Sequence, residues 1–414
     1  MEFPLLKYMD YKKLFKNFSL SFVMLLALAN VNLTAAPAFF EKIDLFKAGE
    51  NDFALYRIPG IVVTTKGAVL AYCEARKNSS SDWAEIEIHL RRSIDGGKTW
   101  ATPVKIAHHG ERLPRSVVAL KVKKSSSEDQ TVNNPVAIVD RQAIHFLYCV
   151  NYERAFYIRS DDDGVTFSKP VEISSTFEKF RPEYDCNVIA TGPAHGIQLA
   201  NGRLLVPVWL STGERGHGPS VTATIFSDDQ GKHWQRGEIA ILDTEPWVSP
   251  NETIVAQLAD GRVMLNARSL AKENRRIVTT SPNGATQWSK PRFDDGLLEP
   301  ICMASMVRLS LKPKSDKNRI LFANPDNLSR EDGKEVFGGH RDRKNLSIKL
   351  SYDEAMTWPV KKVLEPGRSA YSDLAVLPDG TILCFYERPK LLTLARFNLE
   401  WLTDGKDSMS KKKK

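Results

Sequence analysis

A phrase of eight residues, Ser-x-Asp-x-Gly-x-x-Trp, occurs five times along this chain, with changes in some of the copies. Successive copies begin 67, 67, 54 and 70 residues apart. This spacing is too regular for chance turns and too long for one hairpin, so each copy marks one several-stranded unit of a repeat protein. The copies span Ser93–Trp100, Ser160–Phe167, Ser227–Trp234, Ser281–Trp288 and Ser351–Trp358.

The residues of the phrase predict a tight turn between two strands. Asp or Asn accepts hydrogen bonds from nearby backbone N–H groups, Gly adopts a positive φ, and the aromatic residue packs between neighbouring units. The phrase resembles the Asp-box, which lies between the third and fourth strands of propeller blades in sialidases and in several unrelated sugar-binding or sorting propellers. This resemblance implies that the chain forms propeller blades, but it implies no particular reaction. Ala285 and Ala355 replace Gly, and Asn283 replaces Asp, which predicts looser turns in the fourth and fifth copies.

The segments between the turns are typical of strands. Residues 60–72, 202–210 and 261–267 are short, rich in β-branched residues and bounded by Gly, Asp and Asn. No long apolar period of 3.6 residues follows the N-terminal segment, so helix should be minor. The 414 residues, 42% of them apolar, suffice for a large core. We predict an all-β fold, a six-bladed β-propeller over residues 38–403, whose sixth blade joins the N-terminal strand to the segment near Tyr371–Phe397.

The N-terminal segment has the pattern of a secretory signal peptide. Basic residues up to Lys16 precede an apolar run, Phe18–Ala29, and then small residues. We expect a signal peptide over residues 1–37, cleaved near Ala36 or Ala38. The mature protein would then be secreted or periplasmic, without stable membrane insertion. An uncleaved anchor is the alternative.

The net charge of +8 is concentrated at the ends of the chain. Residues 1–37 carry four Lys against two acidic residues, and residues 406–414 carry five Lys against one Asp, which leaves +2 for the body. We expect residues 404–414 to form a basic disordered tail, and we infer no nucleic-acid partner.

The five cysteines are widely spaced and include no CxxC pair. In an exported protein, this pattern excludes a complete disulfide framework and argues against a zinc site. We expect most of them to be buried in strands, and a single disulfide stays open. They are Cys73, Cys149, Cys186, Cys302 and Cys384.

The segment Tyr56–Gly60 places Arg57 at the start of an otherwise apolar strand. Alone, such an Arg would be interpreted as a surface residue. The phrase resembles the (Phe/Tyr)-Arg-Ile-Pro motif that opens the exo-α-sialidase family, and the resemblance continues along almost the whole mature chain. It implies a hydrolase of terminal sialic acids on sialylated glycoconjugates (glycoproteins, glycolipids and oligosaccharides). Some relatives can hold a Ca²⁺ ion, but nothing in this sequence requires one, and we expect no cofactor and no metal.

The resemblance also implies that three arginines bind the carboxylate of the substrate. Arg57 is the first candidate, Arg268 in Leu-Asn-Ala-Arg the second, and Arg343 in Arg-Lys-Asn-Leu-Ser the third. A guanidinium suits this task because it donates two parallel hydrogen bonds to a carboxylate and stays charged at physiological pH. Arg341 is the alternative for the third position. Arg76 resembles the family's fourth arginine, which faces C4 of the sugar.

Tyr371, in Ala-Tyr-Ser-Asp, matches the catalytic tyrosine of the family. Sialidases are an exception among retaining glycosidases, most of which use a carboxylate nucleophile. The reacting carbon already bears a carboxylate, and a neutral phenol avoids repulsion by it. A phenol with a pKa of about 10 needs a base beside it, and Glu252 matches the family's glutamate in that role. Glu252 and Arg268 are separated by one hairpin, which predicts that both lie at the same rim.

Asp82 is the candidate acid/base residue. It is the only Asp between Arg76 and the first Asp-box, where the family has its catalytic Asp on a loop. Such a residue would protonate the leaving oxygen and later activate water. Glu85 and Glu87 are the alternatives if the loop is shifted in register.

Two further residues have supporting or structural interpretations. Glu387, in Phe-Tyr-Glu-Arg, resembles the carboxylate that orients the first arginine, and an ordinary surface ion pair is the alternative. His195 follows a Gly-Pro turn and is expected at the rim or in a turn, because no second metal ligand lies at a suitable spacing.

These residues together predict an exo-α-sialidase that retains configuration and uses Tyr371 as its nucleophile. One alternative is a non-catalytic carbohydrate-binding propeller that keeps Asp-boxes for structure alone. The other is a trans-sialidase, or a hydrolase of a related nonulosonic acid. No motif separates the last two from a sialidase.

Overall fold

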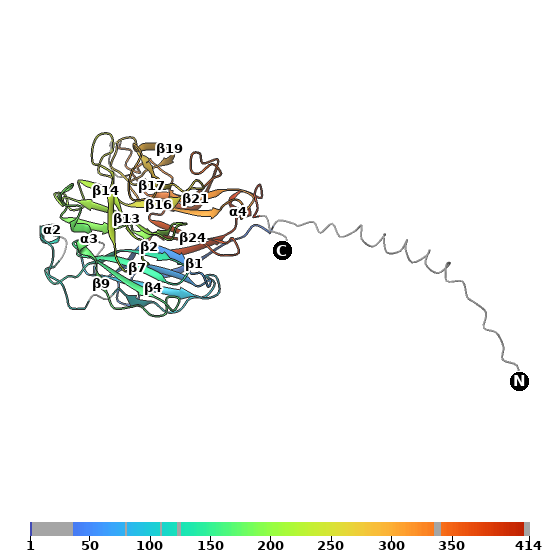
Figure 1. The fold of residues 1–414 in the computed structure, drawn as a ribbon, viewed down its shortest axis with the longest axis horizontal. Coiled ribbons are helices and arrows are strands. Elements are labelled where there is room, and N and C mark those ends of the chain that lie inside the picture. The colour runs from blue at the N-terminus through green and yellow to red at the C-terminus, as the bar shows by residue number, and fades with distance from the viewer. Residues whose placement is uncertain (2–35, 79–80, 108–109, 122–125, 335–340, 410–414) are drawn as a thin grey trace. The chain divides into compact units, whose positions relative to one another are not determined.

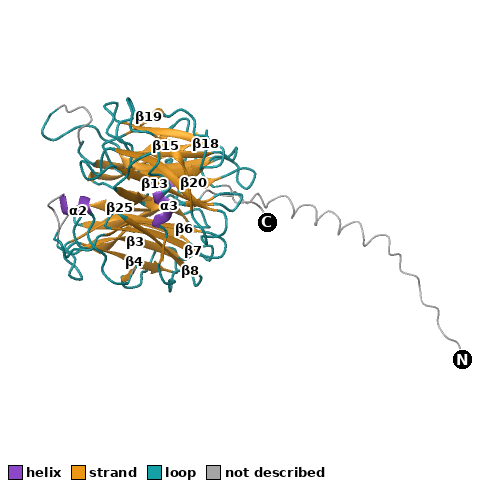
Figure 2. Cartoon of the chain, turned by 60° about the vertical axis from the view of Figure 1, so that its left-hand side comes forward, coloured by secondary structure: helices purple, strands orange, loops and turns teal. Residues whose placement is uncertain are grey.

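Six sheets of mainly antiparallel strands make up the folded body of this chain in the computed structural model (Figures 1 and 2). The structure describes residues 1, 36–78, 81–107, 110–121, 126–334 and 341–409. The sheets follow one another along the chain as the blades of a propeller do. The predicted all-β, six-bladed propeller is therefore confirmed. The predicted signal peptide falls almost entirely on residues 2–35, outside the described residues.

The first five blades contain consecutive strands, apart from a short addition to blade two. Blade one contains β2 (Leu55–Val63), β3 (Val69–Arg76), β4 (Ile86–Ser93) and β5 (Val104–Ile106). Blade two contains β6 (Val132–Val139), β7 (Ile144–Val150), β8 (Arg154–Ser160), β9 (Val171–Glu172) and the later β11 (Ala194–His195). Blade three contains β10 (Val188–Thr191), β12 (Ile197–Gln198), β13 (Leu204–Ser211), β14 (Ser220–Ser227) and β15 (Gln235–Ile241). Blade four contains β16 (Thr253–Gln257), β17 (Val263–Ala267), β18 (Arg275–Ser281) and β19 (Arg292–Leu298). Blade five contains β20 (Ser305–Ser310), β21 (Arg319–Pro325), β22 (Lys344–Ser351) and β23 (Val360–Arg368).

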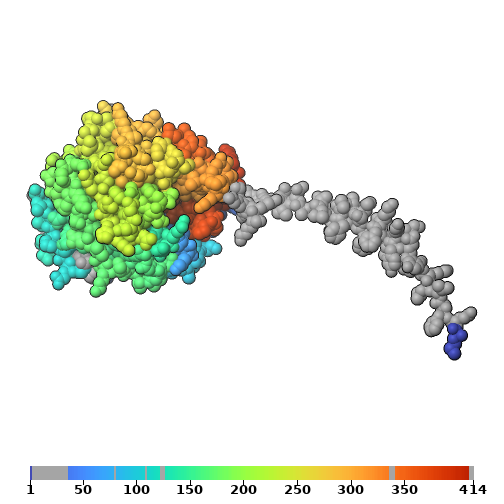
Figure 3. Space-filling model, in the orientation of Figure 1, coloured from blue at the N-terminus to red at the C-terminus, as the bar shows by residue number. Residues whose placement is uncertain are grey.

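The last blade is closed by the first strand of the chain, as predicted. It contains β24 (Ser372–Val376), β25 (Ile382–Arg388), β26 (Leu391–Phe397) and β1 (Phe40–Lys47). The antiparallel pairing of β1 with β26 runs from Phe40 opposite Phe397 to Lys47 opposite Leu391. In Figure 3, the blue atoms of the first strands accordingly lie against the red and orange atoms of the last ones.

Helix is minor in the described part of the chain, as predicted. The helices are α2 (Val117–Lys121), α3 (Ser174–Glu178) and α4 (Leu399–Leu402), drawn in purple in Figure 2. Among the described residues, no helix has the length and apolar character that crossing a bilayer requires.

Each Asp-box begins on the last residue of the third strand of its blade. In the first box, the Oγ of Ser93 accepts a hydrogen bond from the backbone N–H of Gly97 at 2.9 Å. Asp95 accepts a further bond from the backbone N–H of Thr99, also at 2.9 Å. These bonds close the turn to the fourth strand, as the residue types predict.

The expected loosening is not observed in the fifth box, whereas the fourth box is rearranged. In the fourth box, Gly284, the fourth residue, has a φ of 76° and donates to Ser281 at 3.0 Å, a bond that the fifth residue donates in the first box. In the fifth box, Ala355 adopts a φ of 63° and donates to Ser351 at 2.9 Å. The fifth turn keeps its geometry at the cost of a conformation that favours glycine.

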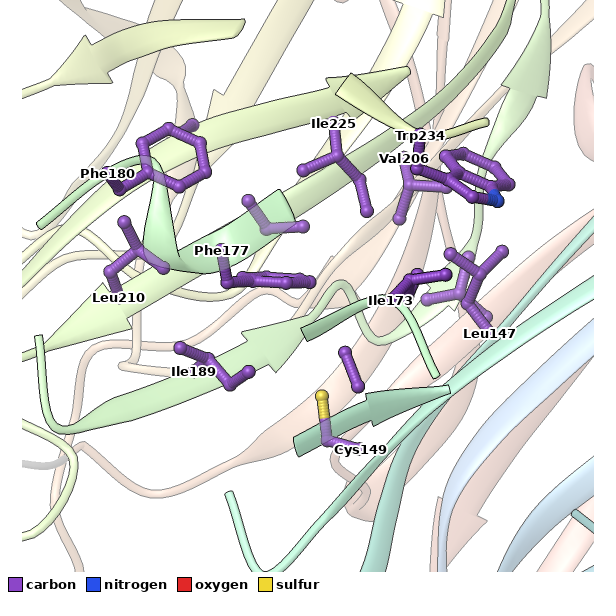
Figure 4. Close-up of a cluster of buried hydrophobic side chains, with 14 of the residues drawn as sticks. Leu147, Cys149, Ile173, Phe177, Phe180, Ile189, Val206, Leu210, Ile225 and Trp234 are labelled. Atoms are coloured by element: carbon purple, nitrogen blue, oxygen red, sulfur yellow. The ribbon is translucent and has the colours of Figure 1, made fainter. Parts of the chain in front are cut away.

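Apolar clusters fill the spaces between neighbouring blades. Between blades two and three, Leu147 and Cys149 of β7 pack with Val206 and Leu210 of β13 (Figure 4). Trp234, the aromatic residue of the third Asp-box, belongs to the same cluster. All five cysteines are buried and unpaired.

The predicted disordered tail needs correction at its start. Asp407 is buried and forms an ion pair with Arg319, at 2.7 Å between Oδ1 and Nη2. The same carboxylate accepts a hydrogen bond from the hydroxyl of Tyr352 at 2.8 Å. The disordered tail was predicted from the local charge pattern alone, and Arg319, the partner of Asp407, lies 88 residues away in the sequence. Residues 410–414 lie outside the described residues.

We expect Leu394→Ala to destabilise the closed ring strongly. Leu394 lies on β26 opposite Ile43 of β1 and is fully buried between the last blade and the first. Its truncation should lower the free energy of unfolding by about 2–5 kcal/mol through lost burial and a residual cavity. Urea unfolding measures this loss. Leu242→Ala, at a half-exposed position, is the control and should change the same quantity by less than about 0.5 kcal/mol. If both variants changed the free energy of unfolding equally, the closure of the ring by β1 and β26 would be contradicted.

Candidate active site

The predicted site residues come from one end of the blades. In an antiparallel blade, the start of the first strand, the end of the second and the start of the third lie at one end, and the turn to the fourth strand lies at the other. Arg57 lies near the start of β2, Arg268 follows β17, Arg343 precedes β22 and Tyr371 precedes β24. The Asp-boxes therefore occupy the opposite end of the propeller.

Six of the eight predicted residues line one cavity of about 430 Å³. The other two lie directly behind its wall, where Arg76 contacts Asp82 and Glu387 contacts Arg57. The fold thus unites side chains that are as much as 314 residues apart. The six lining residues are Arg57, Asp82, Glu252, Arg268, Arg343 and Tyr371.

The phenol of Tyr371 lies at the centre of these charges. Its hydroxyl donates a short hydrogen bond to Glu252 and accepts one from Nη1 of Arg268 at 2.8 Å. The same Nη1 forms an ion pair with Glu252. The guanidinium carbons of Arg57 and Arg343 lie 5.1 Å and 5.3 Å from the centre of the phenol ring. Three cations therefore surround one hydroxyl group that already has a carboxylate as its proton acceptor.

The protonation state of Tyr371 follows from this environment. Burial raises the pKa of the phenol well above its usual value, and the Glu252 carboxylate raises it further. Arg268, Arg343 and Arg57 lower it without offsetting those two effects. The phenol is protonated at neutral pH, so it becomes a nucleophile only if its proton moves to a base such as Glu252.

Asp82 is held between two arginines at the mouth of the cavity. Its Oδ1 lies 2.7 Å from Nη2 of Arg76 and 3.5 Å from Nη1 of Arg57. Burial acts to raise the pKa of the Asp82 carboxyl, but Arg76, Arg57 and His217 more than offset it, and the pKa lies well below the usual value. Arg76 is itself fully buried and paired with Glu74 at 2.7 Å. Asp82 is therefore an ionised carboxylate at neutral pH.

Glu387 orients Arg57 from behind. Its two oxygens accept from Nε and Nη2 of Arg57 at 3.1 Å and 3.3 Å. The first oxygen also accepts from the backbone N–H of Ile58 at 2.9 Å. Ile58 has a φ of 58°, which is a strained conformation for a β-branched residue. The carboxylate thus fixes both the side chain and the unusual backbone of this strand.

The structure separates the alternatives that the sequence left open. Arg343 lines the cavity beside Tyr371, and its Nε donates to the carbonyl of Ile301 at 3.1 Å. Arg341 instead donates to Asn274 at 3.2 Å and lines a neighbouring cavity of about 460 Å³. Arg343 is therefore the third arginine at this site.

The alternatives to Asp82 have other partners. Glu85 forms an ion pair with Arg112 at 2.6 Å, and Glu87 pairs with Lys105 at 2.8 Å. Neither glutamate lines the cavity. Asp82 is therefore the loop carboxylate that the cavity wall presents.

His195 is not at the rim, where it was expected. It is buried on β11, and its Nδ1 lies 2.7 Å from Oδ1 of Asp373. The same carboxylate accepts from the hydroxyl of Ser305 at 2.8 Å and from the backbone N–H of Ile61 at 2.8 Å. These bonds tie the first strands of several blades together at the middle of the propeller, where Figure 1 shows β2, β16 and β24. The prediction failed because the partner Asp373 is distant in sequence.

Several residues of the cavity wall were not predicted. Asn134, Tyr152, Trp209 and His217 line it, and no motif in the sequence marks them. The His217 ring stacks on Trp83 with centroids 5.0 Å apart and an interplanar angle of 16°. Trp83 follows Asp82 directly, so this stack supports the loop that carries the carboxylate.

The cavity has the donors of an anion site rather than those of a metal site. In the described ranges, no three His, Cys, Asp or Glu side chains are grouped as metal ligands would be. Nε of Arg268 is buried without a hydrogen-bond partner in the structure, although a buried N–H normally has one. Such a donor, next to two further guanidinium groups, can bind a ligand carboxylate.

We expect Glu252→Gln to lower the pKa of Tyr371. The substitution removes a negative charge that disfavours the tyrosinate, while the three surrounding arginines remain. Ultraviolet difference titration measures the change, with Glu252→Gln/Tyr371→Phe as the reference that removes the signal of the other tyrosines. An unchanged or higher pKa would show that Glu252 is not the charge that controls this phenol.

Comparison with known proteins agrees with the fold. The BNR repeat-like domain model matches residues 61–384. A sialidase of Micromonospora viridifaciens is 29% identical over 380 residues, which cover 88% of this chain and 55% of that protein. A sialidase of Bacteroides fragilis is 27% identical over 369 residues, covering 82% of this chain and 61% of that protein. The chain thus spans little more than half the length of these two relatives.

Solved structures have the same architecture. The Hadza microbial sialidase Hz136 superposes with a TM-score of 0.70 at 26% identity, covering 87% of this chain and 69% of that one. A leech intramolecular trans-sialidase gives a TM-score of 0.69 at 18% identity, covering 88% and 71%. The second likeness shows the fold alone. The chain belongs to the sialidase family of BNR repeat-like, Asp-box proteins, as its motifs predicted.

Proposed function

We propose that this chain is an exo-α-sialidase that hydrolyses terminal α-linked sialic acids of glycoconjugates with retention of configuration. The single observation that supports this most is the arrangement around Tyr371. Its hydroxyl is bonded to Glu252, and guanidinium groups from three different blades surround it. A non-catalytic sugar-binding propeller would not need a buried phenol bonded to a carboxylate.

The three arginines around Tyr371 select the substrate. With Arg215, these three place four guanidinium groups in the cavity lining against two carboxylates, those of Asp82 and Glu252. A sugar whose anomeric carbon carries a carboxylate satisfies these donors through bidentate hydrogen bonds. The volume of about 430 Å³ lies within the range of small-molecule sites, about 300–1,000 Å³.

In the first step, Tyr371 attacks the anomeric carbon. The phenol proton moves to Glu252, a bond forms between Oη and the anomeric carbon, and the bond to the leaving oxygen breaks. Asp82 gives its proton to that oxygen. Asp82 is ionised before the substrate binds, so it must first take up a proton from solvent. The substrate carboxylate favours this uptake because it binds Arg57 and so weakens one of the charges that hold the pKa of Asp82 low.

In the second step, water replaces the tyrosine. Asp82, now a carboxylate, removes a proton from the water, whose oxygen bonds to the anomeric carbon. The bond to Tyr371 breaks, and Glu252 returns the proton to the phenol oxygen. Two displacements at the same carbon retain its configuration.

A phenol suits this substrate better than a carboxylate would. An anionic nucleophile would approach a carbon that already carries a carboxylate. The neutral, protonated state that burial enforces on Tyr371 avoids that repulsion. Arg268 donates to the phenol oxygen and stabilises negative charge that develops there as the proton leaves.

We expect Tyr371→Phe to abolish release of a fluorescent aglycone from an α-linked sialoside while preserving ligand binding. The substitution removes the attacking oxygen but leaves the arginines in place, so kcat should fall by about 10³-fold or more, which is about 4 kcal/mol of barrier. Continuous fluorescence gives the rate, and calorimetric titration with sialic acid gives the affinity.

Tyr352→Phe is the matched control for that experiment. Its hydroxyl also bonds a carboxylate, that of Asp407, but neither residue lines the cavity. The control should keep wild-type turnover. Full activity of Tyr371→Phe would refute the nucleophile, and binding without turnover by the wild type would favour the sugar-binding alternative.

A further inference from the structure

A fully buried ion pair lies outside the cavity lining and takes no part in the chemistry described above. Arg276 on β18 and Glu299 after β19 have no solvent exposure, and Nη1 of Arg276 lies 2.5 Å from Oε2 of Glu299. Burying two charges costs several kcal/mol of desolvation, and apolar replacements of such pairs are often neutral for stability. The segments that the pair contacts indicate a role other than stability.

The pair fixes the short segment that follows it in the chain. The other oxygen of Glu299 accepts from the backbone N–H of Cys302 at 2.7 Å, and Nη1 of Arg276 donates to the carbonyl of Cys302 at 3.0 Å. Ile301, within this clamp, has a φ of 61°. A β-branched residue holds that conformation only where its surroundings enforce it.

The strained residue carries one of the substrate-binding arginines. The carbonyl of Ile301 accepts from Nε of Arg343 at 3.1 Å and also from its Nη2. A guanidinium bonded through two nitrogens to one carbonyl has its direction fixed. The orientation of Arg343 therefore depends on the backbone that Glu299 and Arg276 hold.

The other side of the Arg276 guanidinium holds a second strand. Its Nε donates to Oδ1 of Asn266 at 2.7 Å, and its Nη2 donates to the carbonyl of Asn266 at 3.1 Å. Asn266 lies on β17, two residues before Arg268. One buried side chain thus contacts the backbone that leads to Arg268 and the segment that orients Arg343.

We propose that Arg276 and Glu299 are positioning residues that set the spacing of Arg268 and Arg343 and thereby the preference of the site for a carboxylate ligand. The proposal rests on the function proposed above for this site. The pair acts through the two arginines. It lies behind them, since neither residue lines the cavity.

The test compares sialic acid with its methyl ester as ligands of the full chain. Esterification removes the negative charge and leaves the rest of the sugar unchanged, so the ratio of the two affinities reports how well the arginines meet a carboxylate. Calorimetric titration gives both dissociation constants. For Glu299→Gln, we expect the affinity for the acid to fall about tenfold, or ~1.4 kcal/mol, while that for the ester stays within about twofold.

Asp407→Asn is the matched control. Asp407 and Arg319 form another buried arginine–carboxylate pair, with Oδ1 and Nη2 2.7 Å apart, and neither lines the cavity. This variant should lower the melting temperature and keep the wild-type ratio of affinities. A merely structural role for Glu299 would give the same result in Glu299→Gln, and that result would overturn the proposal.

A double variant covers the case in which Glu299→Gln fails to fold. Arg276→Met/Glu299→Leu removes both charges together and should fold better than either single change. It also removes the bonds to Cys302 and Asn266, so the ratio should still fall about tenfold. An unchanged ratio would overturn the proposal. If the wild type binds neither ligand, the proposed function itself fails, and that outcome is distinct from an unchanged ratio.

Discussion

The pairing of β1 with β26 is the contact on which the rest of the structure depends. It joins the two ends of the propeller, from Phe40 opposite Phe397 to Lys47 opposite Leu391. Arg57 follows on β2 and Glu387 lies on β25, so the ring closure brings together an ion pair whose members are 330 residues apart. In a closed propeller, the last blade lies beside the first. Because β1 completes the last blade, its pairing with β26 holds the first and last blades together, and only then can they share a site.

The charges of the site are arranged in two layers. Arg57 and Arg268 each have a carboxylate partner, Glu387 and Glu252, and Arg343 is bonded to a backbone carbonyl. These partners fix the guanidinium groups and offset part of the cost of burying them. The donors that remain face the cavity, which makes it complementary to one anion. Burial and the Glu252 carboxylate keep the central phenol protonated until a base accepts its proton, although the three arginines act in the opposite direction.

Sequence patterns predicted the fold and much of the site because both are carried by local motifs. The Asp-boxes marked five of the six blades, and the phrases around Arg57 and Tyr371 contain residues that meet in the cavity. What they missed depends on contacts between distant segments. His217 enters the wall from a loop without a motif, Asp407 finds its partner 88 residues away, and Glu299 has the appearance of a surface residue until the fold buries it. Such contacts have no signature in a single sequence.

The most direct test of the central claim is to trap the intermediate. A sialosyl fluoride with a second fluorine at C3 should react with the protein and hydrolyse slowly, because the electron-withdrawing fluorine disfavours the positive charge of both transition states. Mass spectrometry of the intact protein, followed by peptide mapping, locates the adduct. The account predicts one glycosyl group per chain on the peptide that contains Tyr371, and none in Tyr371→Phe. An adduct on another residue, or turnover without any adduct, would contradict it.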